Sequence, residues 1–181
     1  MNVKLLSIAT AALLFSTVTQ AANTGVIRFI GSVTDATCNI VPTDANGSVT
    51  HDIDLGEAVA ADLTDTSPSS PAVNFALVPS PGSPTECTDG GKVVEVGFNG
   101  AYDVTGLANE SGTAGNASVL LEGQTTAGWH KYTVNNQSAD LASIAGTGAI
   151  NFRAAMIKTT NGLPVTNGTV ITQATYSVVY K

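Results

Sequence analysis

The sequence predicts an all-β protein built as a sandwich of short strands. Its 181 residues include 24 Thr, 19 Val and 9 Ile, so 52 residues are β-branched. Branched side chains pack well on a pleated surface and lose rotamer freedom in a helix. Apolar and polar residues also alternate in short runs, and clusters of Asn, Gly, Pro and Asp separate these runs. Many short strands joined by turns are typical of a β-sandwich.

Residues 1–21 have the pattern of a secretory signal peptide. Lys4 precedes an apolar stretch from Leu5 to Phe15, and small residues follow up to Ala21, where we expect cleavage, or one residue later. The alternative is a membrane anchor, but a stretch of about 11 residues is shorter than the roughly 20 needed to span a bilayer. Cleavage would leave 160 residues and, through the loss of Lys4, would change the formal net charge from −7 to −8.

Eight segments of the mature chain have the composition or the alternation of strands. Turn residues such as Asn46-Gly47 and Asn167-Gly168 lie between several of them. Residues 56–65 are the only segment with a helical pattern, and we expect one or two turns there. The predicted strands are residues 24–33, 49–56, 72–78, 92–98, 118–123, 129–134, 150–157 and 169–181.

The composition and the cysteine count exclude several classes of function. With 7 Lys+Arg against 14 Asp+Glu, the chain has few cations to neutralise a phosphate backbone, so we expect no nucleic-acid partner. Cys38 and Cys87 do not form a zinc-binding pattern. After export they would meet an oxidising compartment, where a disulfide is expected rather than two free thiols.

The sequence shows no recognisable catalytic or metal-binding motif, so we expect neither an enzyme nor a cofactor. It contains no Gly-x-Ser-x-Gly elbow and no phosphate-binding glycine loop. His51 and His130 are far apart in the sequence and fit surface positions on strands. Asp52 and Asp54 are two residues apart in one predicted strand and therefore share a face. A solvated sheet face explains that pair better than an acid/base site does.

Both ends of the mature chain carry an alternating strand pattern. At the N-terminal end, Ile27, Phe29 and Val33 share a face with Gly31. At the C-terminal end, alternation continues to the penultimate residue, Tyr180. Unpaired strand edges at the termini invite association, so this arrangement indicates pairing with another chain.

These features resemble the pilin subunits of chaperone–usher fimbriae, in particular the major subunits of type 1 fimbriae. The resemblance covers essentially the whole chain and includes VTDATCNI at residues 33–40 and HDIDLGEA at residues 51–58. It implies an incomplete immunoglobulin-like β-sandwich that lacks its final strand. It also implies a signal peptide at 1–21, an N-terminal donor-strand extension at 22–35 and a pilin domain at 36–181.

The resemblance further implies a structural subunit of an adhesive surface fimbria. The subunit would pass through the periplasm to the cell surface, carried by a periplasmic chaperone to an outer-membrane usher, and would polymerise head to tail with identical or related subunits. The donor-strand residues would be Ile27, Phe29, Gly31 and Val33. The chaperone would bind the C-terminal strand through Gly168, Tyr176, Val178, Tyr180 and Lys181.

Two other classes of function stay open at this point. A shaft subunit could itself bind host glycans, with Tyr102, Trp129 and Tyr132 as candidate contacts, although such aromatic residues more often fill a core. A secreted β-sandwich enzyme would need a catalytic group that the sequence does not show. The sequence leaves open whether the subunit is a major or a minor one.

Overall fold

The computed structural model describes residues 38–64, 70–88, 93–160 and 162–181, which contain nine β-strands and two 3-10 helices. This part of the chain contains no α-helix, so the predicted all-β class is confirmed. The helices are η1 (Ala60–Asp62) and η2 (Thr85–Cys87). The strands are β1 (Ile40–Thr43), β2 (Val73–Pro79), β3 (Val93–Gly100), β4 (Leu107–Ala108), β5 (Ala117–Thr125), β6 (Gly128–Tyr132), β7 (Gln137–Ala142), β8 (Ile150–Lys158) and β9 (Ala174–Tyr180).

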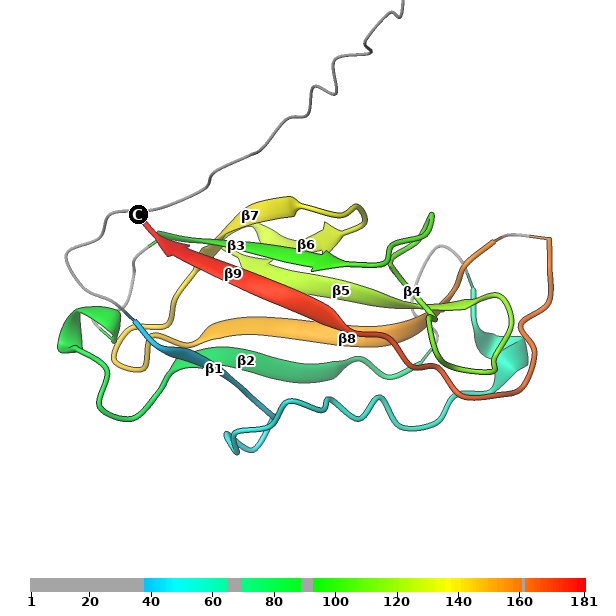
Figure 1. Cartoon of the computed structure of the whole chain (residues 1–181), viewed down its shortest axis with the longest axis horizontal. Coiled ribbons are helices and arrows are strands. Elements are labelled where there is room, and N and C mark those ends of the chain that lie inside the picture. The colour runs from blue at the N-terminus through cyan, green and yellow to red at the C-terminus, as the bar shows by residue number, and fades with distance from the viewer. Residues whose placement is uncertain (1–37, 65–69, 89–92, 161) are drawn as a thin grey trace, which may run out of the picture. The chain divides into compact units, whose positions relative to one another are not determined.

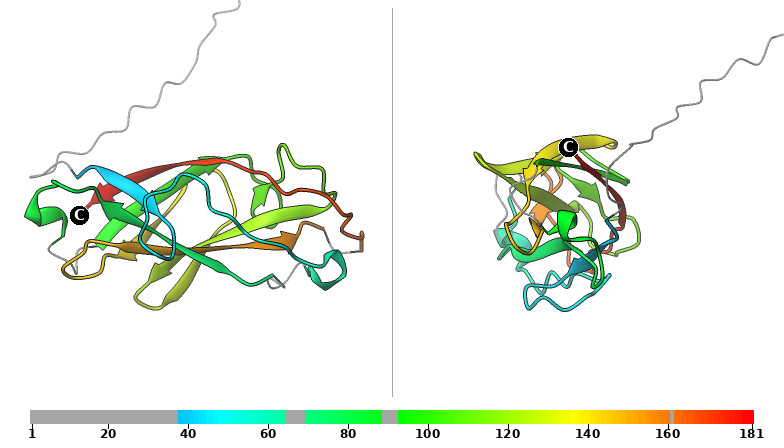
Figure 2. Two further views of the ribbon diagram at one scale, coloured as in Figure 1. Left: turned by 90° about the horizontal axis from the view of Figure 1, so that it is seen from below. Right: turned by 90° about the vertical axis from the view of Figure 1, so that its left-hand side faces the viewer.

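The strands form two antiparallel sheets (Figures 1 and 2). The first has the order β1-β2-β8-β5-β4, and β6 pairs with β5 beside this path. The second has the order β7-β3-β9. In this arrangement β1 and β9, which come from opposite ends of the described chain, each lie at the end of a sheet.

The core lies between the two sheets and follows the period of two along each strand. Val94, Val96 and Phe98 point inward from β3 and are almost completely buried. The Phe98 ring meets Tyr132 edge-on at 4.9 Å and Phe152 edge-on at 5.4 Å, between ring centroids. Burying side chains of this size stabilises the fold by about 1.5–3 kcal/mol each.

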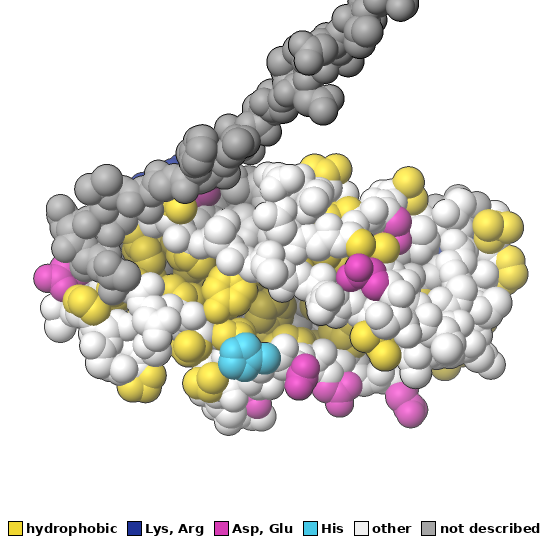
Figure 3. Space-filling view, in the orientation of Figure 1, with side chains coloured by type: hydrophobic (Ala, Val, Ile, Leu, Met, Phe, Trp, Pro, Cys, Tyr) yellow, Lys and Arg dark blue, Asp and Glu magenta, His cyan; other side chains and the backbone are white. Residues whose placement is uncertain are grey.

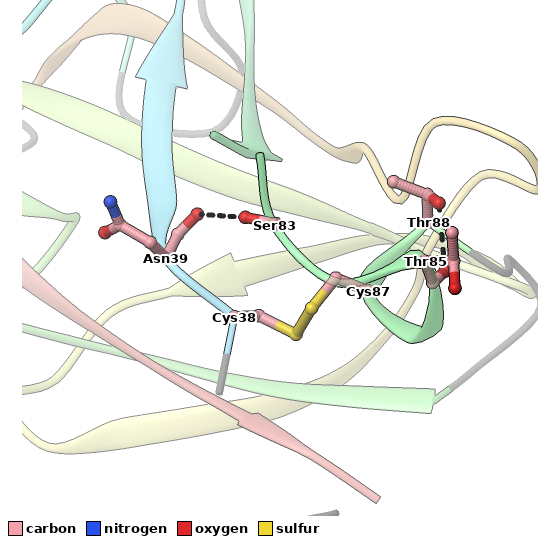
Figure 4. The surroundings of a disulfide bond; sticks show 6 residues. All are labelled: Cys38, Asn39, Ser83, Thr85, Cys87 and Thr88. Carbon is pink, nitrogen blue, oxygen red and sulfur yellow. Dashed lines mark hydrogen bonds between the residues drawn. A yellow bond between two sulfur atoms is a disulfide. The ribbon is translucent and has the colours of Figure 1, made fainter. Parts of the chain in front are cut away.

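Cys38 and Cys87 form the predicted disulfide, which joins the start of β1 to η2 (Figure 4). Their Cα atoms are 5.7 Å apart and Cys87 is 2% exposed. Two hydrogen bonds tie the same end of β1 to the loop between β2 and η2, because Asn39 O accepts from Ser80 N at 2.7 Å and from Ser83 Oγ at 3.4 Å. The start of β1 is therefore fixed to the body of the domain.

Five predicted strands are confirmed and correspond to β2, β3, β5, β6 and β8. The predicted strand at 169–181 is confirmed only from Ala174 onward. Residues 169–171 instead bond to the loop at 109–114, partly through side chains: Ile171 N donates to Asn109 Oδ1 at 2.8 Å, and Ala114 N donates to Thr169 O at 3.0 Å. The segment at 24–33 lies outside the described residues.

Other predictions of secondary structure were wrong or incomplete. Residues 49–56 do not form a strand, because only Val49 makes a bridge, to Thr43. The helical pattern at 56–65 corresponds only to the three residues of η1. Three strands, β1, β4 and β7, were not predicted.

Among the described residues, no helix has the length and apolar character needed to cross a membrane.

Candidate functional site at the open edges of the two sheets

One edge of β9 faces β3, and the other edge faces no strand among the described residues. Lys181 N donates to Val93 O at 3.1 Å, which places the odd-numbered residues of this strand in hydrogen-bonded pairs with β3. The backbone groups of the even-numbered residues, Tyr176, Val178 and Tyr180 among them, therefore point away from β3. They form a row of donors and acceptors that another strand could pair with.

The edge of β1 that faces away from β2 also lacks a strand partner, although Pro42 has no N–H and its carbonyl is already paired. Ser80 N donates to Asn39 O, so the backbone groups of Ile40 and Pro42 point away from β2. Pro42 O accepts from Thr50 N at 3.1 Å, and from there the chain continues without a strand partner through residues 51–58. Two sheet edges, one in each sheet, are thus left without a strand between them in the described structure.

Apolar side chains form the floor between these edges. Figure 3 shows hydrophobic side chains gathered in a hollow beneath β9 in that view. The half-buried residues that pack against the core include Leu55 from the segment after β1, Phe75 from β2, and Ala174, Val178 and Tyr180 from β9. We refer to this hollow between β1, residues 51–58 and β9 as the groove.

One hydrogen bond spans the groove from edge to edge. The Tyr176 hydroxyl on β9 donates to Ile40 O on β1 at 2.9 Å, and the Tyr176 side chain remains 36% exposed. The acceptor is one of the β1 backbone groups that point away from β2. A strand entering the groove would therefore compete with Tyr176 for this carbonyl.

Three half-buried hydroxyls have no hydrogen-bond partner within the described part of the chain: Tyr102 Oη, Thr172 Oγ1 and Tyr180 Oη. Burial raises the pKa of the Tyr102 and Tyr180 hydroxyls above its ordinary value, so both stay protonated. Tyr180 packs against the core from β9, and its hydroxyl is a buried atom.

The C-terminal residue is held on the outer face of the β7-β3-β9 sheet. Lys181 Nζ lies 2.6 Å from Asp140 Oδ1 and 3.1 Å from Glu95 Oε2. The Ser138 hydroxyl, together with Lys181, lowers the pKa of Glu95, and these two acids raise the pKa of Lys181. All these groups are exposed to solvent, so their contribution to stability is small.

Gly168 lies before β9 and makes a close approach to the neighbouring loop. A Cβ at this position would lie 2.4 Å from Ala114 N and 2.5 Å from the carbonyl carbon of Thr113. Only glycine fits there without a shift of the backbone. This packing gives the residue a local structural role in the free subunit.

The three candidate receptor contacts occupy different environments. Tyr132 is 0% exposed and donates to Val96 O at 3.0 Å, and its burial raises its pKa well above the ordinary value. It therefore presents no surface to a ligand, and this part of the receptor hypothesis is wrong. Tyr102 is half-buried against the core. Trp129 is 36% exposed, with the Arg153 guanidinium 4.3 Å from its ring.

Neither histidine forms part of a recognisable catalytic arrangement among the described residues. His51 is exposed, and it precedes residues without strand structure rather than lying in a strand. His130 on β6 contacts Gln137 Nε2 through its Nε2 atom at 3.1 Å. The described residues contain no group of three or more His, Cys, Asp or Glu that could hold a metal ion.

The proposed donor residues Ile27, Phe29, Gly31 and Val33 lie outside the described residues, so only the groove side of the proposed contact belongs to the described structure. The sequence indicated both ends of the chain as pairing elements. It did not indicate β1, whose backbone forms the wall of the groove opposite β9. β1 has only four residues, one of them Pro42, and this is too short for a recognisable strand pattern.

The fold and the groove define a class: an all-β sandwich with a strand edge of each sheet left open. No family model matches the chain. The K99 fimbrial protein of Escherichia coli is 42% identical over 83 residues, which are 46% of this chain and 42% of that protein. The chain thus aligns with less than half the length of this relative.

Solved structures give the corresponding comparison of folds. The P pilus rod subunit PapA aligns over 86% of this chain and 99% of its own, with a TM-score of 0.57 and 21% identity. A structure of a chaperone–usher pilus aligns over 90% of this chain with a TM-score of 0.49 and 20% identity.

The predicted resemblance to fimbrial subunits is confirmed. The chain is related in sequence to a fimbrial protein over part of its length, and it has the fold of a pilus rod subunit. The K99 protein is named as a fimbrial protein and PapA as a pilus rod subunit, in agreement with the resemblance predicted from the sequence.

Proposed function

We propose that this protein is a structural subunit of a chaperone–usher fimbria and that it polymerises by donor-strand complementation. The observation that carries the proposal is the groove: an unpaired edge of β9, an unpaired edge of β1 and an apolar floor between them. A strand supplied by another chain would pair with the open edge of β9, would compete with Tyr176 for the Ile40 carbonyl on β1, and would cover the floor.

The extension at 22–35 of the next subunit is the proposed donor. Ile27, Phe29 and Val33 would insert into the groove, and Gly31, in the same phase, would lie where the floor is too shallow for a side chain. Each inserted apolar side chain would contribute about 1.5–3 kcal/mol before the cost of ordering the strand is subtracted.

Before assembly, a periplasmic chaperone would occupy the same groove. An exposed apolar hollow favours aggregation, so a subunit in transit needs a partner that covers it. The C-terminal strand, with Tyr176, Val178 and Tyr180, would pair with the chaperone, and the carboxylate of Lys181 would bind basic groups on it. An outer-membrane usher would then exchange chaperone for donor strand as the fibre reaches the cell surface.

Deletion of residues 22–33 tests the donor role. The variant should still form a complex with the chaperone, because its groove and C-terminal strand are intact, but it should not assemble into fibres. The measurement is assembly of purified chaperone–subunit complexes into multimers that resist boiling or denaturant. Normal assembly by the deletion variant would contradict the proposal.

A second candidate function, binding of host glycans by the shaft itself, rests on the exposure of Trp129. Its ring is fixed by Arg153, which is in turn paired with Glu122 at 2.6 Å. An ordered, exposed indole is a suitable surface for the apolar face of a sugar. Loss of glycan-array binding in assembled Trp129→Ala fibres, with binding retained in Tyr102→Phe fibres, would support this function. Equal binding by all fibres would exclude Trp129 as a contact.

A further inference from the structure

The segment that borders the groove after β1 has two chemically different sides. Ile53 and Leu55 are half-buried, and Leu55 packs against the core, while Asp52 and Asp54 are exposed. This alternation is that of an extended edge strand, although the segment has no partner strand in the described structure. The inner side thus belongs to the apolar floor, and the outer side presents two carboxylates two residues apart.

The two acids are held close to the edge of the groove. Asp54 Oδ1 accepts a hydrogen bond from Gly56 N at 2.9 Å, and Thr50 Oγ1 donates to the backbone O of Asp52 at 3.0 Å. These short-range bonds fix the backbone of the segment on both sides of Ile53. The Asp54 carboxylate is thus held by a bond to the backbone of its own segment, whereas at Asp52 the bond holds the backbone.

Along β9 itself, the opposite wall of the groove carries no charge on its outer side; the first charge is Lys181, just past the strand, which is paired with Asp140 and Glu95. The residues of β9 that alternate with the inward-facing ones are Thr175, Ser177 and Val179. A strand lying between the two walls would therefore have neutral neighbours along β9 and acidic neighbours along residues 51–58.

The proposed donor segment has a matching charge. Residues 22–37 contain one cation, Arg28, and one acid, Asp35. Arg28 lies between Ile27 and Phe29, so when these two point into the groove, Arg28 points outward. That is the side on which Asp52 and Asp54 are exposed.

We propose that Arg28 of the incoming extension forms a cross-strand ion pair with Asp52 or Asp54 and that this pair sets the register of the inserted strand. The inference rests on the proposed function. A shift of the donor by one residue would place Arg28 over the apolar floor, and a shift by more than two would move it past both carboxylates. Opposite charges on neighbouring strands stabilise pairing, and like charges oppose it.

The test is a charge exchange in the full mature chain, prepared as chaperone–subunit complexes. Arg28→Glu alone, and Asp52→Lys with Asp54→Lys, should each slow assembly into denaturant-resistant multimers by about three- to tenfold, because an attraction becomes a repulsion. A chain with all three changes should assemble at close to the original rate. Asp52→Lys and Asp54→Lys made singly would then identify the carboxylate that pairs.

Two controls separate this pair from general effects of charge. Asp62→Lys changes an exposed acid on η1, outside the 51–58 segment, and should leave assembly unchanged. At about 1 M salt, where the screening length falls to about 3 Å, the difference between the original chain and Arg28→Glu should shrink. Each variant must also form the chaperone complex in normal yield, which shows that it folds.

The outcomes distinguish this proposal from the one on which it rests. If the unaltered chain assembles and the charge reversals change nothing, or the triple variant is slower than both partial ones, the ion pair is refuted and donor-strand complementation stands. If the unaltered chain does not assemble from its chaperone complex, the proposed function itself fails, and the ion pair fails with it.

Discussion

At the scale of single residues, Trp129 and Tyr132 illustrate what a strand pattern determines and what it leaves open. The two residues are three apart on β6, and an odd separation on a strand places side chains on opposite faces. Tyr132 accordingly fills the core, and Trp129 lies outside against Arg153. The period of two could have separated them from the sequence, but it could not say which one faces inward, because both are large and aromatic.

The cysteine pair was predictable from the sequence because the signal-peptide pattern predicts an oxidising environment and no other cysteine competes. Its position in the fold was not predictable. The bond connects β1 with η2 across 49 residues, and neither element had been predicted. The disulfide therefore holds the start of β1, one wall of the groove, to η2.

Replacement of Cys38 and Cys87 by serine should destabilise the subunit by about 4 kcal/mol, the chain-entropy value for a loop of this length. Urea unfolding of the mature subunit, with and without reductant, measures the change. We expect the loss to lower the yield of the chaperone complex as well. A reduced or doubly substituted subunit with an unchanged unfolding midpoint would contradict the expectation.

At the scale of elements, strands were predictable where the sequence has enough apolar and β-branched residues to mark a buried strand. β2 and β3 have buried or half-buried apolar residues at every second position, whereas β5 and β8 carry buried runs of consecutive apolar residues at 119–121 and 154–157. β7 was not predicted because its sequence, QSADLA, has no β-branched residue. Pairing with β3 along six residues makes it a strand regardless of propensity.

The predicted strand at 49–56 failed for a related reason. Ile53 and Leu55 alternate with Asp52 and Asp54 as in an edge strand, but strand structure also requires a hydrogen-bonding partner. In the described structure the segment pairs with β1 only at its start, where Val49 forms a bridge to Thr43 and Thr50 N donates to Pro42 O. If our proposal is right, the partner is the donor strand, and the pattern describes the assembled fibre rather than the single chain.

Removal of residues 178–181 tests the role of β9. The deletion takes away three of the residues that pair with β3, including Val178 and Tyr180 from the groove floor, as well as the terminal carboxylate. We expect it to abolish the chaperone complex and to expose the subunit to proteolysis. Co-purification with the chaperone measures this directly.

A matched control keeps the strand and changes only its outer contacts. Lys181→Ala removes the bridges to Asp140 and Glu95 but retains the carboxylate and the β9 pairing. Because these bridges are exposed, the complex should form normally. Normal co-purification of the 178–181 deletion would show that the chaperone does not depend on the end of β9.

At the scale of the whole molecule, the proposed contact joins two different surfaces of one chain. The donor segment precedes the domain, and the groove lies between β1 and β9. Such a contact is heterologous: each copy uses its extension on one neighbour and its groove on the other. Because it does not close on itself, it generates a filament rather than a dimer, and the two ends of that filament are chemically different.

This polarity predicts the behaviour of a mixture. A mature subunit that lacks residues 22–33 has a groove but no donor, so it can receive a strand from the next copy but cannot fill the groove of the copy before it. It should therefore enter a filament only as its first subunit. Raising its share in assembly from chaperone complexes should increase the number of filaments and shorten them.

Labelled variant subunits, observed by electron microscopy, measure where the variant goes. We expect a single label at one end of each filament and none along the shaft, because every internal position requires both a donor and a groove. A variant with an intact extension that carries the same label should be distributed along the whole length. If labels of the deletion variant were found within the shaft, the filament would be continuous through a subunit that has no strand to donate. This result would show that residues 22–33 do not hold neighbouring copies together.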